Sequence, residues 1–121
     1  MRPILTDDQV HPSIRDKVDG YLKEERDALL SAIDEHDVVV VGMGQNPVVK
    51  SVRKLLDKMD VPYHYIGHGS YVSGYRHRLV YKMLTGWVTF PMVFVKGVFV
   101  GGFSDVKKLC DEGEFRKLLD G

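Results

Sequence analysis

The spacing of hydrophobic positions changes several times along the chain, and each change predicts a different element. From Ser13 to about Asp34 the apolar residues recur near the helical period, and Pro12 suits the start of a helix. Gly20 interrupts this stretch, so one weakened helix and two separate helices are both open alternatives. The run from Val38 to Val41 is uniformly β-branched, which is typical of a central strand covered on both faces.

A helix is predicted from Asn46–Pro47 to about Met59, because apolar residues recur along one of its faces. That stripe consists of Val49, Val52, Leu55, Leu56 and Met59. A second strand is predicted over 61–66, and a loop rich in glycine and serine over 67–74. A further helix is predicted from Tyr75 to Leu84, since Gly86 suits a helix end.

Near the C-terminus two short apolar segments, 93–95 and 98–100, flank Lys96-Gly97 in the pattern of a β-hairpin. Ser104 is predicted to cap a last helix that begins at Asp105. The segment from Glu114 to Leu119 either continues that helix or forms a short one. This order predicts an α/β fold, with a small four-stranded mixed sheet and helices on both of its faces. Residues 1–36 are expected to form an N-terminal arm and helical extension, and residues 37–121 the domain.

The composition of the chain indicates its size class, its expected location and the partners that its charge disfavours. With 121 residues, 44% of them hydrophobic, the chain has the size of one domain with its own core. Its 17 basic and 17 acidic side chains cancel, so we expect neither nucleic acid nor a membrane surface as a partner. No apolar run has the length of a bilayer span, and residues 1–8 lack the apolar core of a signal peptide, so a cytoplasmic location is expected. Cys110 is the single cysteine, which excludes an intramolecular disulfide.

Three segments, in this order, resemble the glutaredoxin family of the thioredoxin fold, and within it the monothiol branch. The first is the buried strand, a loop and a helix, with Pro47 at the second position of the redox tetrad and Lys50 after it. The second runs from Trp87 to Pro91, and the third runs from Phe94 to Asp105 and contains a double-glycine turn. The resemblance covers about two thirds of the chain, from about Val38 to Leu119.

The resemblance implies a cradle for glutathione or for an extended thiol peptide. In this family the proline of the Thr-x-Pro segment is cis, and the residue before it binds the peptide through its backbone; Phe90 and Pro91 occupy these positions. The double-glycine turn and the next helix start receive the γ-glutamyl end, and a basic residue meets the glycyl carboxylate. The expected binding residues are Arg78, Thr89, Phe90, Pro91, Gly102, Phe103, Ser104 and Asp105.

The redox cysteines of the family are replaced in this chain. Asn46 stands where the attacking cysteine belongs, and Val49 stands where the resolving cysteine belongs. Thiol–disulfide exchange requires a thiolate, and monothiol relatives hold their iron–sulfur cluster with the same cysteine and glutathione. Met43 and Val88 also depart from the family pattern. We therefore expect a site for glutathione or an extended peptide that has no catalytic residue, no metal and no cluster, with Asn46 capping the helix that opens at Pro47.

Three hypotheses for the function remain open. The first is a glutaredoxin-like protein that binds glutathione or an extended peptide without catalysing exchange. The second is a structural module whose N-terminal extension covers the sheet or mediates homodimerisation. The third is a thiol–disulfide oxidoreductase that acts in cell redox homeostasis through Cys110, although the helical spacing predicts that this thiol faces inward. His64, His68 and His77 lack the spacing of a metal site and are expected to be solvated loop residues.

Overall fold

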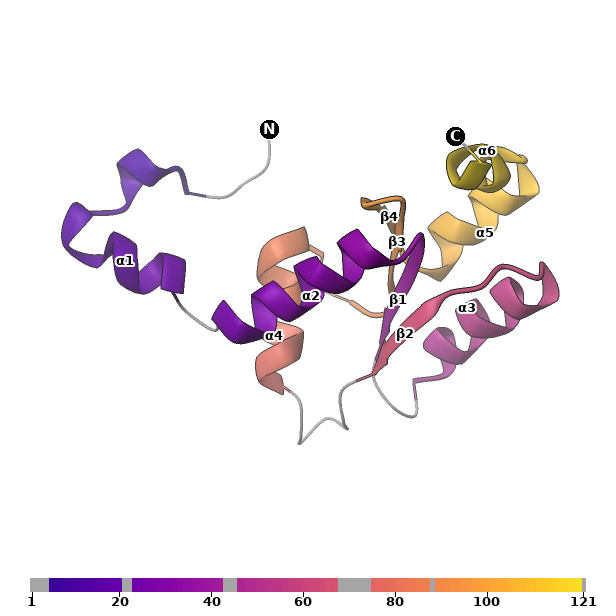
Figure 1. Ribbon diagram of the computed structural model, residues 1–121, viewed down its shortest axis with the longest axis horizontal. Helices are drawn as coiled ribbons and strands as arrows, with labels where there is room; N and C mark the ends of the chain where they lie inside the picture. Colours follow the sequence, from indigo (N-terminus) through magenta and orange to yellow (C-terminus); the bar gives the residue numbers. More distant parts are fainter. Residues whose placement is uncertain (1–4, 21–22, 43–45, 68–74, 88, 121) are drawn as a thin grey trace.

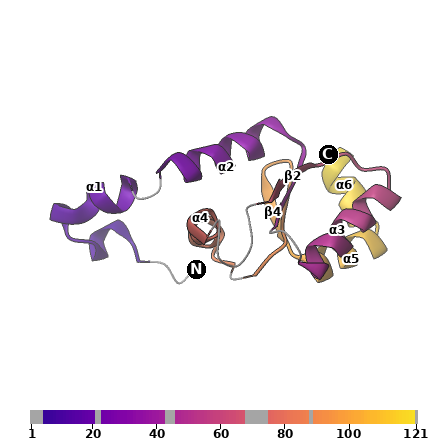
Figure 2. The same ribbon diagram turned by 90° about the horizontal axis from the view of Figure 1, so that it is seen from below.

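The computed structural model describes residues 5–20, 23–42, 46–67, 75–87 and 89–120. A four-stranded sheet lies between two layers of helices (Figures 1 and 2). One layer contains α2 (Lys23–Glu35) and α4 (Tyr75–Thr85), and the other contains α3 (Pro47–Lys58), α5 (Phe103–Asp111) and α6 (Glu114–Asp120). A short 3-10 helix (Asp7–Gln9) and α1 (Pro12–Gly20) precede these layers and lie away from the sheet in both views.

The sheet consists of β1 (Val38–Gly42), β2 (His64–Gly67), β3 (Met92–Val95) and β4 (Val98–Gly101), in the order β2-β1-β3-β4. β1 is parallel to β2 and antiparallel to β3, which confirms the predicted mixed sheet with helices on both faces. Val41 pairs with Met92, and Val93 pairs with Gly101. The end of β1, the start of β3 and the end of β4 therefore lie together at one end of the sheet.

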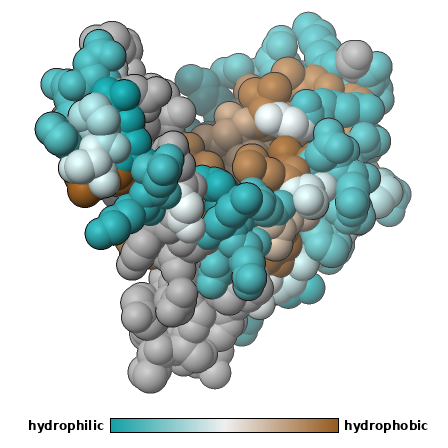
Figure 3. Space-filling view, turned by 60° about the vertical axis from the view of Figure 1, so that its left-hand side comes forward, coloured by the Kyte–Doolittle hydropathy of each residue, from teal (hydrophilic) through white to brown (hydrophobic). Residues whose placement is uncertain are grey.

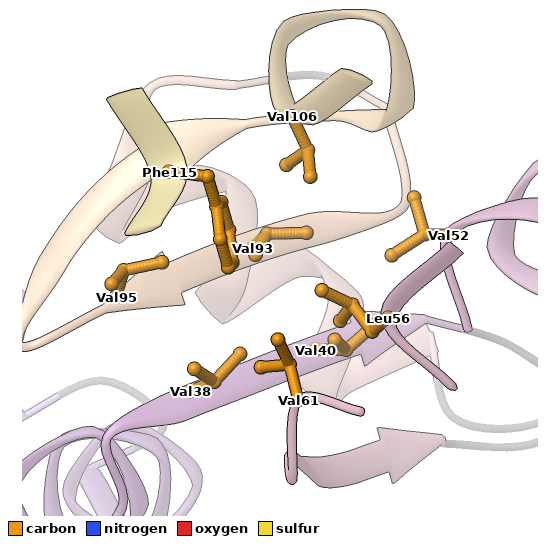
Figure 4. Packing of buried hydrophobic residues seen from close by; sticks show 9 residues of the cluster. All are labelled: Val38, Val40, Val52, Leu56, Val61, Val93, Val95, Val106 and Phe115. Atoms are coloured by element: carbon orange, nitrogen blue, oxygen red, sulfur yellow. The ribbon is translucent and has the colours of Figure 1, made fainter. Parts of the chain in front are cut away.

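The core lies on both sides of β1, all of whose residues are buried, as predicted for a central strand. Successive side chains alternate between the faces. Val38 and Val40 join the cluster beneath α3, α5 and α6, in which Phe115 is fully buried (Figure 4). Val39 and Val41 join the opposite cluster, beneath α2 and α4.

The stretch that contains Gly20 forms two helical segments, α1 and α2. Leu29 of α2 is 1% exposed and packs with Val39, and α2 also contacts α4. α2 is therefore part of the packed body, while the proposed boundary between residues 36 and 37 stays a prediction. The predicted loop after Gly67, and both Met43 and Val88, lie outside the described residues.

The last helices correct one prediction and settle an alternative. α5 begins at Phe103, and its N-cap is Gly102 rather than Ser104. The reason is that the backbone N–H of Gly102 donates to Oδ2 of Asp105 at 3.0 Å, so this acid holds the helix start from inside the first turn, as the acid at the third helical position of a capping box does. Glu114–Asp120 forms a separate helix, because Gly113 ends α5 with a φ of +75°.

β2 is shorter than the predicted strand over 61–66, since it begins at His64. Pro62 lacks the backbone N–H that a strand ladder needs.

On the surface, hydrophilic residues surround an apolar area in the view of Figure 3. An apolar hollow of about 400 Å³ between α2, α4 and the β3–β4 hairpin is lined mainly by Leu29, Leu30, Ile33, Leu84, Phe94 and Phe99. In the described part of the chain, no helix is both long and apolar enough to cross a membrane.

Candidate functional site

Seven of the eight predicted binding residues lie around one pocket of about 170 Å³, at the end of the sheet where β3 begins and β4 ends. The lining residues are Val48, Trp87, Thr89, Phe90, Pro91, Gly102, Phe103, Ser104 and Asp105. Pairing of β3 with β4 brings Trp87 and the segment 89–91 together with the segment 102–105. Val48 and Trp87 were not among the predicted binding residues. Trp87 carried a signal, because it belongs to the second family-like segment, whereas nothing in the local sequence marked Val48.

The segment before β3 forms one wall of the pocket. The peptide bond between Phe90 and Pro91 is cis. The ring of Phe90 meets the ring of Tyr81 edge to face, with centroids 6.5 Å apart, and Nζ of Lys82 lies 5.8 Å from the Phe90 centroid. Both partners belong to α4, so that helix holds this wall in position.

The two glycines of the turn have different structural roles. Gly101 has a φ of +104°, which other residues rarely adopt. Gly102 has a φ of −100°, which any residue can adopt, so the missing side chain matters there for space. A Cβ on Gly102 would lie 3.4 Å from the carbonyl oxygen of Pro91 and 4.0 Å from both Oδ2 of Asp105 and Nε1 of Trp87. A methyl-sized space at the pocket thus borders two acceptor oxygens and one indole nitrogen.

The start of α5 makes this end of the pocket polar. Asp105 is exposed, and one of its carboxylate oxygens accepts the N–H of Gly102. A carboxylate has further lone pairs, so Asp105 can still accept a bond from a ligand cation. The first N–H groups of α5 have no acceptor within the helix and lie at its positive end. The pocket therefore has groups for both charges side by side: the first N–H groups of α5 can bind an anion, and the Asp105 carboxylate can bind a cation.

Trp87 forms the inner side of the pocket. Its ring packs edge to face on Phe99, with centroids 5.4 Å apart, and its backbone N–H donates to Oγ1 of Thr85 at 3.1 Å. Its Nε1 is buried without a hydrogen-bond partner, the one such side-chain nitrogen or oxygen among the described residues. A buried donor without an acceptor is costly, so this group marks a place where the polar contacts of the fold are incomplete.

Asn46 caps α3, as predicted. Its Oδ1 accepts the backbone N–H groups of Val48 at 2.9 Å and of Val49 at 3.2 Å. The side chain of Val49 is 2% exposed and packs against β1, where a Cβ on Gly42 would lie 2.6 Å from its Cγ1. The helix start therefore presents a capping amide, and an apolar side chain fills the space beneath it.

Two further candidate residues lie away from the pocket. Arg78 is 8% exposed on α4 and does not line the pocket, so its contact with a ligand carboxylate stays a prediction. Cys110 lies on α5, where its Sγ donates to Sδ of Met59 at 3.3 Å. Burial raises the pKa of the Cys110 thiol, which lowers the thiolate fraction on which redox chemistry depends.

The histidines do not form a metal site in the described part of the chain. His64 is exposed on β2 rather than in a loop, and its ring stacks on that of His36 with centroids 4.1 Å apart and an interplanar angle of 3°. The nitrogen lone pairs of an imidazole lie in its ring plane, and the two parallel planes do not meet, so the pair does not converge on one ion. Over the described residues, no three side chains from His, Cys, Asp and Glu are placed to hold a metal. His68 lies outside those residues.

Comparison with known proteins relates the chain to one family. No protein-family model matches it. A glutaredoxin-like protein of Dictyostelium discoideum is 39% identical over 101 residues, which are 84% of this chain and 82% of that protein. A protein named as an uncharacterised monothiol glutaredoxin of Caenorhabditis elegans is 26% identical over 97% of this chain and 82% of its own length. The crystal structure of the buckwheat glutaredoxin–glutathione complex matches with a TM-score of 0.76 and 23% identity, covering 83% of this chain and 91% of that one.

Proposed function

Because the chain belongs to the glutaredoxin family and has its fold, we propose that it binds glutathione, or the end of an extended peptide, without catalysing thiol–disulfide exchange. The observation that carries the proposal is the space over Gly102, which borders the Pro91 carbonyl oxygen and the Asp105 carboxylate. This space opens at the N-terminus of α5.

Such a site suits a group that has an ammonium and a carboxylate on the same carbon. The ammonium has two acceptors, the Pro91 carbonyl and Asp105, while the carboxylate has the first N–H groups of α5. The γ-glutamyl end of glutathione has this pair of charges. That the buckwheat relative was crystallised with glutathione supports the same ligand.

The size of the pocket limits what it encloses. Its volume of about 170 Å³ is below the range of sites that bury a whole drug-sized ligand. One end of the ligand would thus be enclosed, and the remainder would extend along the backbone of Phe90 towards the first turn of α3, whose Val48 lines the pocket. Strand-like pairing with the Phe90 backbone requires no particular side chain on the ligand, so a peptide with a suitable terminus also fits.

The absence of exchange follows from the residues at the start of α3. Exchange needs a thiolate that attacks a disulfide sulfur, and Asn46 supplies an amide whose oxygen is already bonded to two N–H groups. Cys110 lies outside the pocket, and its raised pKa disfavours the thiolate. The site thus retains groups for binding and lacks the reacting atom.

Isothermal titration of the protein with glutathione tests the proposal. We expect saturable binding to the wild type, and at least about tenfold weaker binding to Gly102→Ala, because its methyl group occupies the ligand space. The dipeptide Cys-Gly, which lacks the γ-glutamyl group, should bind much more weakly. Gly20→Ala is the matched control, since a Cβ there meets nothing within 4 Å.

Thermal denaturation verifies that both variants are folded. We expect this because the added methyl group lies at an ordinary contact distance from its neighbours at Gly102 and meets nothing within 4 Å at Gly20. Absence of heat and of chemical-shift changes with glutathione in the folded wild type would contradict ligand binding. Equal affinity of Gly102→Ala and the wild type would contradict the location. Turnover of a glutathione mixed disulfide by the wild type would contradict the loss of catalysis.

A further inference from the structure

Among the described strands, β2 lies at one edge of the sheet, and its first and last residues, His64 and Gly67, are exposed. In the order β2-β1-β3-β4, β2 pairs with β1 on one side and with no other strand in the described part of the chain. The alternate N–H and C=O groups of a strand at such an edge can bond to an added extended chain. This edge lies on elements other than those that form the pocket at Gly102.

Helix α3 runs beside this edge and presents several positive charges. Lys50, Arg53 and Lys54, with the single carboxylate Asp57, line a hollow of about 220 Å³. Within the described residues, no carboxylate oxygen lies within 4.0 Å of these three cations. α3 as a whole has four cationic side chains and one carboxylate, although the complete chain has a formal net charge of zero.

Arg53 connects the hollow to the strand edge. Its Nε donates to the hydroxyl of Tyr63 at 3.3 Å, and its guanidinium carbon lies 4.1 Å from the ring centroid of Tyr65, a residue of β2. The hydrogen bond to Tyr63 raises the pKa of Arg53, which stays charged. A guanidinium held by two contacts loses less conformational freedom on binding than a mobile one, so its contacts with a partner cost less entropy.

We propose that the β2 edge and the cations of α3 form a docking site for an extended, acidic segment of a partner protein. The segment adds to β2 as a strand and directs alternate carboxylates towards Lys50, Arg53 and Lys54. Alternate residues of a strand are about 6.6 Å apart, and Lys50 and Lys54 lie about 6 Å apart along the helix axis. A row of carboxylates at strand spacing therefore matches the row of lysines.

Charge complementarity favours this partner over others. A basic segment is repelled by the cations of α3. A purely apolar segment can pair with the strand edge but makes no use of these cations. A carboxylate row satisfies both the strand edge and the helix. The proposal is independent of glutathione binding, because Lys50, Arg53, Lys54 and β2 do not line the pocket at Gly102.

The probe is a fluorescein-labelled octapeptide of alternating Glu and Val, titrated into the full chain and followed by fluorescence anisotropy and by amide chemical shifts. We expect the largest shifts in Tyr63 to Gly67 and in α3, both with and without saturating glutathione. Increasing the NaCl concentration from about 50 to about 500 mM should weaken binding. The same peptide with Lys in place of Glu should not bind.

Two variants and two modified peptides separate the contributions. Lys50→Glu/Lys54→Glu should raise the Kd at least about tenfold, whereas Lys108→Glu, an exposed lysine on α5, is the matched control and should not change it. The two modified peptides are N-methylated at the odd or at the even residues, which keeps every charge but removes half of the main-chain N–H groups. Binding should be abolished in the peptide whose methylated N–H groups are those that face β2.

Several results would overturn the proposal. These are no binding up to about 2 mM peptide, shifts confined to the pocket at Gly102, and equal affinities for the double variant and Lys108→Glu. Unchanged binding of both N-methylated peptides would show simple anion binding rather than strand addition. Displacement of the labelled peptide by inorganic pyrophosphate as effectively as by the unlabelled peptide would show the same.

Discussion

Replacement of Asn46 by alanine tests what this residue does at the start of α3. Alanine removes the acceptor of two hydrogen bonds, those from the N–H groups of Val48 and Val49. Loss of a helix N-cap costs about 1 kcal/mol and at most about 2 kcal/mol. The upper half of that range is expected here, because α3 contributes Val49, Val52 and Leu56 to the core and cannot fray freely. For a domain of this size, a loss of about 1.5–2 kcal/mol should lower the melting temperature by about 6–8 °C.

The assay is urea denaturation followed by circular dichroism, in which the free energy of unfolding and the m-value are fitted together. Asn46→Asp and Asn46→Ser are the matched controls, because both keep a side-chain acceptor. Asp also places a negative charge at the positive end of the helix. We expect both controls to lie within about 0.5 kcal/mol of the wild type, and Asn46→Ala to lose stability at an unchanged m-value.

The reasoning is refuted if Asn46→Ala unfolds at the same urea concentration as the wild type. It is also refuted if Asp, Ser and Ala destabilise equally, because the effect then comes from something other than the cap. A confirmed result means that Asn46 stabilises the protein as the N-cap of α3. Glutathione titration of the same variants shows whether the cap also holds the pocket in shape.

Three other changes have defined outcomes. Asn46→Cys in a Cys110→Ser background should create glutathione-dependent reduction of a small mixed disulfide, because a helix N-terminus favours a thiolate; a folded variant with no turnover would mean that the pocket does not orient glutathione. Gly101→Ala should cost about 1–3 kcal/mol in urea denaturation, because a Cβ at a φ of +104° would lie 2.5 Å from Oδ2 of Asp105; a loss below about 0.5 kcal/mol would contradict it. Burial raises the pKa of Tyr81 to about 12. An unfolded tyrosine loses its proton near 10, so stability should fall as pH rises from about 10 to 12, and the fall should be shallower in Tyr81→Phe; identical slopes would contradict this.

The elements of the fold could be predicted because their signals are local. A run of β-branched residues, an apolar stripe at helical spacing and a Lys-Gly turn each depend on neighbours along the chain. The predictions failed where an interaction between residues determined the boundary. Ser104 looked like a helix cap, yet the carboxylate of Asp105 bonds back to Gly102 and starts α5 earlier.

The candidate site was predictable only as far as its motifs extend. The Phe90–Pro91 and Gly102–Asp105 segments were identified from their resemblance to a family, and the structure places them around one pocket. Arg78 was chosen on the same ground, but it does not line that pocket. The contact of Arg53 with Tyr65 had no signal, because no sequence rule pairs a helix residue with a particular position on a neighbouring strand.

Periodicity and residue chemistry thus established the order of helices and strands and the lack of a thiol at the start of α3, since both are properties of consecutive residues. Folding added the pocket lined by Val48 and Trp87, the buried indole nitrogen and the row of cations beside the β2 edge. These features arise from packing between segments that are distant along the chain, and their geometry depends on side-chain volumes and strand register, which no local pattern contains.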